Sequence, residues 1–249
     1  MDLTQALMLS PLILVVAFLY SSVGHGGASG YLAVMLLFLA ALAPREMSAT
    51  ALILNLLVAG LASLAYWRAG HFRVRLLLPF LITSIPTAFL GGRLLVPATT
   101  YAFVLSGALA FAAVRLFLPA SASAGATRPV LLGLAIPIGA GIGLLSGIVG
   151  VGGGIFLSPL LLLFRWADPK QTAATSATFI WINSLSGLLG RLSAGTLATG
   201  PLAIMVVPAF LGGLLGSQLG ARRFSGLTIR RILAFALVIA AGKLLLTAL

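Results

Sequence analysis

One glycine-rich stretch interrupts the second half of an otherwise apolar chain, and it reads Gly147-Ile148-Val149-Gly150-Val151-Gly152-Gly153-Gly154-Ile155-Phe156-Leu157-Ser158-Pro159. Four of its glycines fall within residues 150–154, where each would cost a helix about 1 kcal/mol relative to alanine. The cluster therefore predicts a break between two helices. At membrane depth, the backbone groups that a break leaves without partners are tolerated only when they are buried in protein or line a cavity. The alternative is that these glycines serve only the close packing of helices.

The composition is that of a chain surrounded by lipid. Of its 249 residues, 61% are hydrophobic and 7% are charged, and its mean hydropathy is +1.19. These values predict an all-α, polytopic membrane protein. The net charge of +12 does not indicate nucleic-acid binding, because the Lys and Arg residues lie mostly at the ends of apolar segments, where the positive-inside rule expects them. The absence of cysteine excludes thiol catalysis and zinc–thiolate sites.

A second, weaker break lies near the N-terminus. It runs from Ser22 to Gly30, contains His25, and separates the apolar runs Pro11–Tyr20 and Tyr31–Ala41. Each run has about 10–12 residues, whereas a helix that crosses the hydrocarbon core needs about 20. The unit is therefore either one broken helix that crosses or a re-entrant hairpin that enters and leaves on the same side. Three runs of ordinary spanning length follow, at Met47–Trp67, Leu76–Leu95 and Tyr101–Leu118.

After a small-residue linker at Ala120–Pro129, the pattern starts again. Several motifs of the first half recur in the same order in the second half: Gly24-His25-Gly26-Gly27 as Gly150-Val151-Gly152-Gly153, Ser48-Ala49-Thr50 with Asn55 as Ser176-Ala177-Thr178 with Asn183, and Phe89-Leu90-Gly91-Gly92 as Phe210-Leu211-Gly212-Gly213. Such order indicates an internal duplication. We predict two homologous halves, residues 1–122 and 123–249, that together form one transport domain. Each half has a broken or re-entrant hairpin and three transmembrane helices.

The basic residues indicate how the halves are oriented. If the broken segments cross the membrane, the halves are parallel and the fifteen Lys and Arg residues divide about evenly between the two sides. If the segments are re-entrant, the halves are inverted, and only Arg45, Arg93, Arg191 and Lys243 face the side opposite the other eleven. Because cytoplasmic faces are basic, we predict inverted repeats, external termini and hairpin tips that meet near the midplane. We expect Arg93 and Arg191 to snorkel to the interface, the alternative being that their charge guides an anion.

These features resemble the sulfite exporter TauE/SafE family of membrane permeases. The paired glycine-rich segments, the duplicated Ser-Ala-Thr with Asn, and the eight-segment layout carry the resemblance, which covers nearly the whole chain. Its most specific piece is Gly147–Pro159, and Ser22–Gly30 is the weaker counterpart. The resemblance implies transport of small, often sulfur-containing anions such as sulfite, thiosulfate or organosulfonates. We expect the protein to lie in a bacterial inner (cell) membrane.

The residues also indicate an anion site. A hairpin tip presents the free N–H groups and the positive dipole end of its second arm, and glycine lets an oxyanion approach that backbone closely. The serines either donate to the anion or bond back to their own helix. The asparagines either contact the substrate or clamp the broken backbone. The predicted substrate-binding residues are Ser22, Gly24, His25, Gly26, Gly27, Ser29, Gly150, Gly152, Gly153, Gly154, Ser158, Asn55 and Asn183.

His25 is the titratable residue inside a break. It either senses or carries a proton, which would make protons the coupling ion, or it stays neutral and bonds to hairpin carbonyls. We expect no enzyme, cofactor or metal, because two histidines, three acids and no cysteine supply neither a nucleophile with its base nor a ligand set. The predicted function is a secondary transporter of a small anion that works by alternating access in a lipid bilayer. An anion channel with the same pore chemistry is the alternative.

Overall fold

The computed structural model describes residues 3–39, 44–94, 127–195 and 202–225, together with residues 42, 97, 227, 228, 231, 232 and 235. Every regular element within these residues is an α-helix. The predicted span Tyr101–Leu118 and residues 236–249 lie outside the described residues. Within the part that is described, the prediction of an all-helical protein is confirmed.

The helices form two series of matched length. The first series is α1 (Leu3–Ser21, 19 residues), α2 (Ala28–Phe38, 11), α3 (Pro44–Arg68, 25) and α4 (Val74–Arg93, 20). The second is α6 (Leu132–Val149, 18), α7 (Gly154–Leu163, 10), α8 (Pro169–Ser193, 25) and α9 (Leu202–Arg222, 21). The first arm is longer than the predicted run Pro11–Tyr20, because α1 accommodates Pro11 in its interior and begins at Leu3. The arms of each broken unit are therefore unequal.

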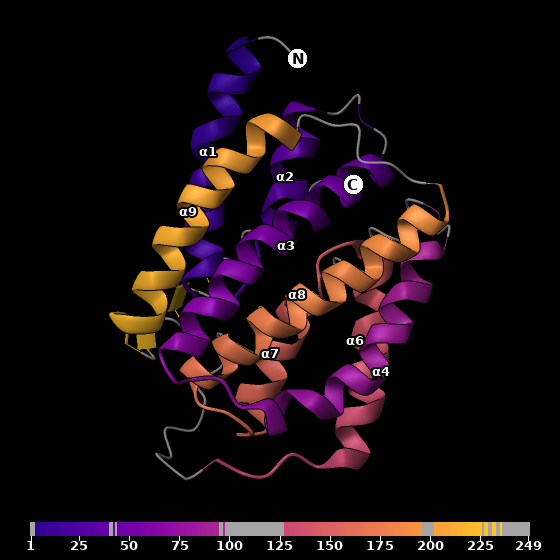
Figure 1. Ribbon diagram of the computed structural model, residues 1–249, viewed down its shortest axis with the longest axis vertical. Coiled ribbons are helices and arrows are strands. Elements are labelled where there is room, and N and C mark those ends of the chain that lie inside the picture. Colours follow the sequence, from indigo (N-terminus) through magenta and orange to yellow (C-terminus); the bar gives the residue numbers. More distant parts are fainter. Residues whose placement is uncertain are drawn as a thin grey trace.

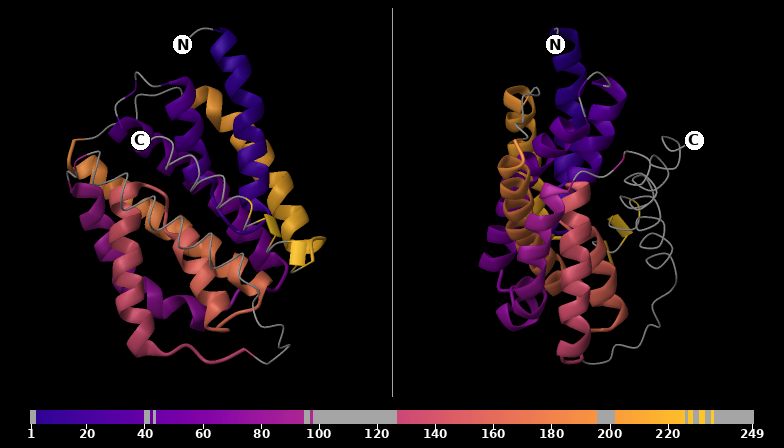
Figure 2. Two further views of the ribbon diagram at one scale, coloured as in Figure 1. Left: turned by 180° about the vertical axis from the view of Figure 1, so that it is seen from behind. Right: turned by 90° about the vertical axis from the view of Figure 1, so that its right-hand side faces the viewer.

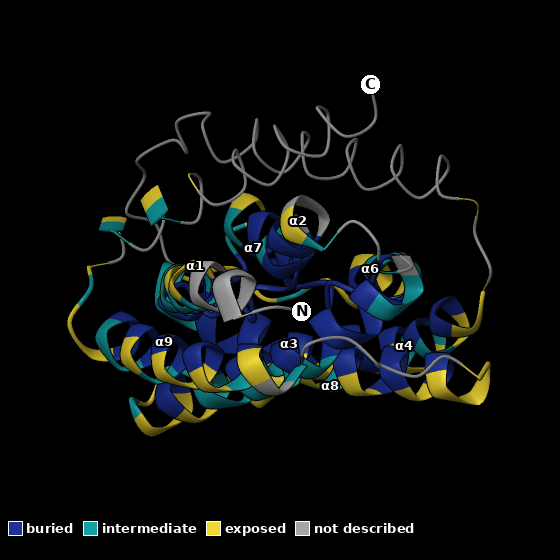
Figure 3. Cartoon of the chain, turned by 90° about the horizontal axis from the view of Figure 1, so that it is seen from above, coloured by how far each residue is buried: buried dark blue, intermediate teal, exposed yellow. Residues whose placement is uncertain are grey.

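Four long helices lie side by side in one layer, in the order α9, α3, α8, α4 (Figure 3). The broken units cover this layer: α1 packs on α9, α2 on α3, α7 on α8 and α6 on α4. If each helix is replaced by its counterpart in the other series, this set of neighbours is reproduced. The packing therefore has the pattern of a pseudo-two-fold arrangement, with α3 and α8 at its centre.

Counterpart helices run in opposite directions along the molecule (Figure 1). Helix α1 descends from the end that carries the N-terminus, whereas α6 ascends from the opposite end. The central helices α3 and α8 are likewise antiparallel, and the reverse view shows the same arrangement (Figure 2). The glycine-rich breaks that follow α1 and α6 both lie in the middle of the molecule.

Basic loops from both halves meet at one end of the molecule. Arg128 N–H donates to the carbonyl of Arg165 at 2.8 Å. Lys170 Nζ, at the start of α8, donates to the carbonyl of Ala221 near the end of α9 at 3.4 Å, and His71 Nε2, between α3 and α4, lies 3.2 Å from the same oxygen. The α3–α4 loop, the α7–α8 loop and the end of α9 are therefore adjacent.

Within the described residues, four helices are long and apolar enough to cross a bilayer: the stretches Arg45–Arg68, Val74–Arg93, Leu132–Val149 and Ile204–Arg222. Helix α8 has the same length as α3 but is more polar, and its Ser176, Asn183 and Ser184 are fully buried. Its polar side chains face protein because lipid would leave them without hydrogen-bond partners. Helix α8 therefore brings the polar groups of the second half to the centre of the molecule.

Candidate functional site

The two helix breaks depend on glycine backbone geometry. In the first break, Gly24 and Gly27 have φ values of +76° and +91°. In the second, Gly150, Gly152 and Gly153 have φ values of +81°, +76° and +82°. Residues with a Cβ rarely adopt these conformations. The break predicted within residues 150–154 is confirmed, since α6 ends at Val149 and α7 begins at Gly154, and its glycines are needed for the turn of the backbone itself.

The breaks meet in the interior. His25 Nε2, in the first break, lies 3.1 Å from Ser158 Oγ on α7, and Ser158 Oγ lies 2.7 Å from Ser176 Oγ on α8. The exposed fraction is 2% for His25 and 0% for both serines. Residues 133 positions apart are thus joined in one buried polar chain. All thirteen predicted site residues are buried.

Asn55 of α3 clamps both breaks. Its Oδ1 accepts from Ala28 N–H at the start of α2 at 3.2 Å, and its Nδ2 donates to the carbonyl of Val151 at 3.3 Å and to Ser184 Oγ at 2.9 Å. The side chain uses both of its polar atoms in these contacts. Of the two predicted roles for Asn55, the structure favours the clamp.

Asn183, the counterpart of Asn55 on α8, is used differently. Its Nδ2 donates to the carbonyl of Phe179 on its own helix at 2.9 Å. Its Oδ1 is buried and has no hydrogen-bond partner within the described residues. Repeated asparagines at matching sequence positions thus have different hydrogen-bonding states.

The serines of the first break bond within their own half. Ser22 Oγ donates to the carbonyl of Leu19 at 2.7 Å, which is the back-bonding alternative. Ser29 Oγ donates to the hydroxyl of Tyr20 at 3.0 Å. Of the three predicted serines, Ser158, in the second half, contacts a residue of the opposite break, His25, within the described residues.

Neighbouring helices pack closely against the glycines. A Cβ on Gly26 would overlap Oδ1 of Asn55, and a Cβ on Gly150 would overlap Oγ of Ser48. The Cβ position of Gly152 lies 2.6 Å from both Asn55 Nδ2 and Ser184 Oγ. The first tip therefore faces the oxygen of the Asn55 amide, and the second tip faces its NH2 group.

The second break also has more unused backbone donors. In the first break, the N–H groups of Gly24, His25 and Ala28 are bonded, whereas those of Gly26, Gly27, Ser29 and Gly30 have no hydrogen-bond partner within the described residues. In the second, the N–H groups of residues 151–155 form a continuous run without a hydrogen-bond partner within the described residues. These groups belong to the turn and to the N-terminus of α7, where the helix dipole favours negative charge.

The prediction that Arg191 snorkels is wrong. Its side chain is 4% exposed, and its Nη2 donates to the carbonyls of Gly147 and Ile148, at 2.7 and 2.8 Å, in the last turn of α6. The last carbonyls of a helix have no partner within that helix, and a guanidinium can cap them. Arg93, by contrast, is exposed and lies over the Phe89 ring.

Besides Ser184, three serines near the second break were not predicted as site residues. Ser48 Oγ donates to the carbonyl of Val149 at 3.2 Å, and Ser176 Oγ contacts Ser158. Ser146 is fully buried, its Oγ has no hydrogen-bond partner within the described residues, and its Cβ borders the Cβ position of Gly153 at 3.3 Å. The repeated Ser-Ala-Thr motif contained the signal for Ser48 and Ser176. Nothing in the sequence distinguished Ser146.

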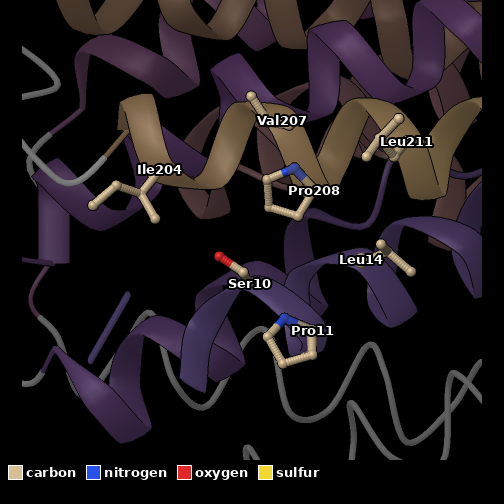
Figure 4. A pocket seen from close by; sticks show the side chains of 7 residues that line it. All are labelled: Ser10, Pro11, Leu14, Ile204, Val207, Pro208 and Leu211. Atoms are coloured by element: carbon tan, nitrogen blue, oxygen red, sulfur yellow. The ribbon is translucent and has the colours of Figure 1, made fainter. Parts of the chain in front are cut away.

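An apolar groove of about 390 Å³ lies between α1 and α9, away from both breaks (Figure 4). Its lining includes Ser10, Pro11 and Leu14 of α1 and Pro208 and Leu211 of α9. It contains no charged side chain and one hydroxyl. An oxyanion would lose its hydration there without gaining enough donors, so the groove is not an anion site.

Comparisons with known proteins agree with this geometry. Residues 9–244 match the family described as sulfite exporter TauE/SafE. The chain is 33% identical over 252 residues to the probable membrane transporter protein y4hK of Sinorhizobium fredii (strain NBRC 101917 / NGR234), which covers 97% of this chain and 99% of that protein.

Two further relatives match shorter parts of the chain. The probable membrane transporter protein YunE of Bacillus subtilis (strain 168) is 29% identical over 104 residues, or 42% of this chain and 38% of that protein. The sulfite exporter TauE/SafE family protein 2 of Arabidopsis thaliana is 38% identical over 74 residues, or 30% of this chain and 16% of that protein. No solved structure matches. The match over nearly the whole chain assigns this protein to the sulfite exporter TauE/SafE family of multi-pass membrane transporters.

Proposed function

We propose that the protein is a secondary transporter of a small, sulfur-containing anion such as sulfite, thiosulfate or an organosulfonate. The anion binds where the two breaks meet, and alternating access moves it across a bacterial inner membrane. The observation that carries this proposal is the buried contact between His25 and Ser158, beside N–H groups at the start of α7 that have no hydrogen-bond partner within the described residues. Helix N-termini with free N–H groups suit oxyanions.

The transporter consists of two inverted repeats, residues 1–122 and 123–249, with re-entrant hairpins. The opposite directions of α1 and α6 support this arrangement. So do the contacts that bring Arg128 to Arg165 and His71 to Ala221, because in a parallel arrangement the two residues of each pair would lie on opposite sides. The basic end is the cytoplasmic end. Sites at the interface of inverted repeats are a recurring plan in secondary transporters.

Purified protein in liposomes tests the function. Sulfite, thiosulfate, organosulfonates, sulfate and carboxylates are offered in turn, and uptake is measured with and without the same anion trapped inside. A transporter gives saturable uptake that internal substrate accelerates by counterflow. Uptake that neither saturates nor responds to internal substrate would indicate an anion channel. If no anion of the panel binds or is taken up, the proposed function is wrong.

A further inference from the structure

The ends of α1 and α6, which lead into the two breaks, are capped by different chemistry. At the end of α1, the neutral hydroxyl of Tyr66 donates to the carbonyl of Ser22 at 2.7 Å. At the end of α6, the cationic guanidinium of Arg191 donates to the carbonyls of Gly147 and Ile148. The second half thus has a buried positive charge where the first half has a phenol.

This difference matters for an anion. The C-terminal carbonyls of a helix carry a partial negative charge of about half an electron. The break after α6 therefore combines the negative end of α6 with the positive end of α7. The negative end of α6 repels an oxyanion. A guanidinium bound to the α6 carbonyls offsets that repulsion.

Arg191 also borders the break itself. The Cβ position of Gly150, the C-cap residue of α6, lies 3.4 Å from Arg191 Nη2. Ser48 Oγ donates to the next carbonyl, that of Val149. The charge is consequently next to the run of backbone donors that starts at Val151.

We propose that Arg191 is a positioning residue that makes the break between α6 and α7 selective for anions, because its charge neutralises the carbonyl end of α6. This inference rests on the proposed function. Arg191 does not touch the substrate; it acts through the α6 carbonyls and through the field that its charge produces in a buried region of low dielectric constant. The anion whose binding this field favours is the oxyanion held at the N-terminus of α7.

Three variants of the full chain separate charge from simple capping, with the dissociation constant for thiosulfate and thermal unfolding as readouts. Arg191→Gln keeps a hydrogen-bond donor and loses the charge, and we expect the dissociation constant to rise about tenfold at an effective dielectric constant of about 20. Arg191→Lys loses the guanidinium geometry but keeps the charge, so the field at the break persists and the dissociation constant should stay within about twofold of that of wild type. The control Arg93→Gln removes an exposed charge from the end of α4 and should change nothing.

The outcomes divide clearly. If wild type binds thiosulfate and Arg191→Gln binds it equally well, Arg191 is only a cap and the inference is wrong, while the proposed function stands. If Arg191→Lys loses as much affinity as Arg191→Gln, the charge is not the cause and the inference is again wrong. If wild type binds no anion of the panel, the proposed function itself fails.

A fourth variant covers the case in which Arg191→Gln does not fold. Arg191→His is charged at low pH and neutral at high pH, whereas thiosulfate stays fully ionised between about pH 6 and pH 9. The affinity of this variant relative to wild type should fall as the pH rises through that range. Taking the ratio to wild type removes any effect of His25, the titratable side chain inside the first break. A constant ratio would overturn the inference.

Discussion

The break between α1 and α2 and the break between α6 and α7 share a glycine pattern but differ in how their polar groups are used. In the first, Asn55 Oδ1 accepts from Ala28 N–H, and Tyr66 caps the carbonyl of Ser22. In the second, the N–H groups of residues 151–155 and the buried hydroxyl of the adjacent Ser146 have no hydrogen-bond partner within the described residues. Both breaks thus keep polar groups without a hydrogen-bond partner within the described residues, including His25 Nδ1 at the first, but the second has the longer continuous run of backbone donors.

This difference indicates a division of roles. A buried acceptor at the first tip, the Asn55 oxygen, opposes an anion there, whereas the NH2 group of the same amide faces the second tip. Buried polar groups without partners are costly, so they persist where a ligand satisfies them. We therefore expect the first break to act as a scaffold and the second to hold the substrate.

The largest expected effect concerns the sides from which the two breaks enter the membrane. The chain has no cysteine, so Ala69→Cys, Leu227→Cys and Ala194→Cys can each be labelled alone. In an inverted arrangement, the first two label only from the cytoplasm and the third only from outside. Labelling of Ala69→Cys and Leu227→Cys from opposite sides would restore parallel halves.

The asparagine pair gives the next largest effect. Asn55→Ala removes three buried hydrogen bonds that join both breaks, so the free energy of unfolding should fall by about 2–4 kcal/mol. Asn183→Ala removes one bond within its own helix and should cost about 1 kcal/mol or less. Thermal unfolding of both variants in detergent measures the difference. If both variants lose the same free energy of unfolding, Asn55 does not clamp the two breaks more strongly than Asn183 does.

Much of this arrangement could be predicted from the sequence, because some constraints are local. Four glycines in residues 150–154 break a helix whatever surrounds them, and the repeated Ser-Ala-Thr with Asn indicates a duplication. The hydrogen-bond partners of the buried polar side chains could not be predicted in the same way. Whether Asn55 and Asn183 clamp or stay free depends on helices from opposite halves that only the fold brings together.

The wrong prediction for Arg191 has an identifiable cause. Its position near the end of an apolar segment fits snorkelling, since that rule considers only the distance to the membrane surface. The carbonyl end of α6, 43 and 44 positions earlier in the chain, provides a closer partner. The position of α1 relative to Pro11 was missed for a similar reason, because packing against α9 supports a helix that continues through the proline.

A smaller effect distinguishes serines at the two breaks. Ser146→Ala removes a hydroxyl that has no hydrogen-bond partner within the described residues, so stability should be unchanged while anion affinity falls about threefold or more. Ser29→Ala breaks the bond to Tyr20 and should cost about 1 kcal/mol of stability without changing affinity. Binding titration and thermal unfolding of both variants provide the check. The reverse pattern would assign the ligand to the first break.

The smallest effect concerns protons. His25→Gln keeps a hydrogen-bond donor toward Ser158 but cannot titrate. If His25 carries the coupling proton, the variant should bind the anion normally and lose the pH dependence of transport, measured in liposomes with an imposed pH gradient. An unchanged pH profile would mean that His25 serves only as a structural link between the breaks.

A structure with selenite, the heavier chemical analogue of sulfite, would test the asymmetry of the two breaks most directly. Selenium gives an anomalous signal, so its position does not depend on interpretation of weak density. We expect one selenium peak within hydrogen-bonding distance of the N–H groups of residues 152–154, on the side of the break that Ser146 borders. A peak at Gly26 and Gly27, or one away from both breaks in protein that binds selenite, would contradict it.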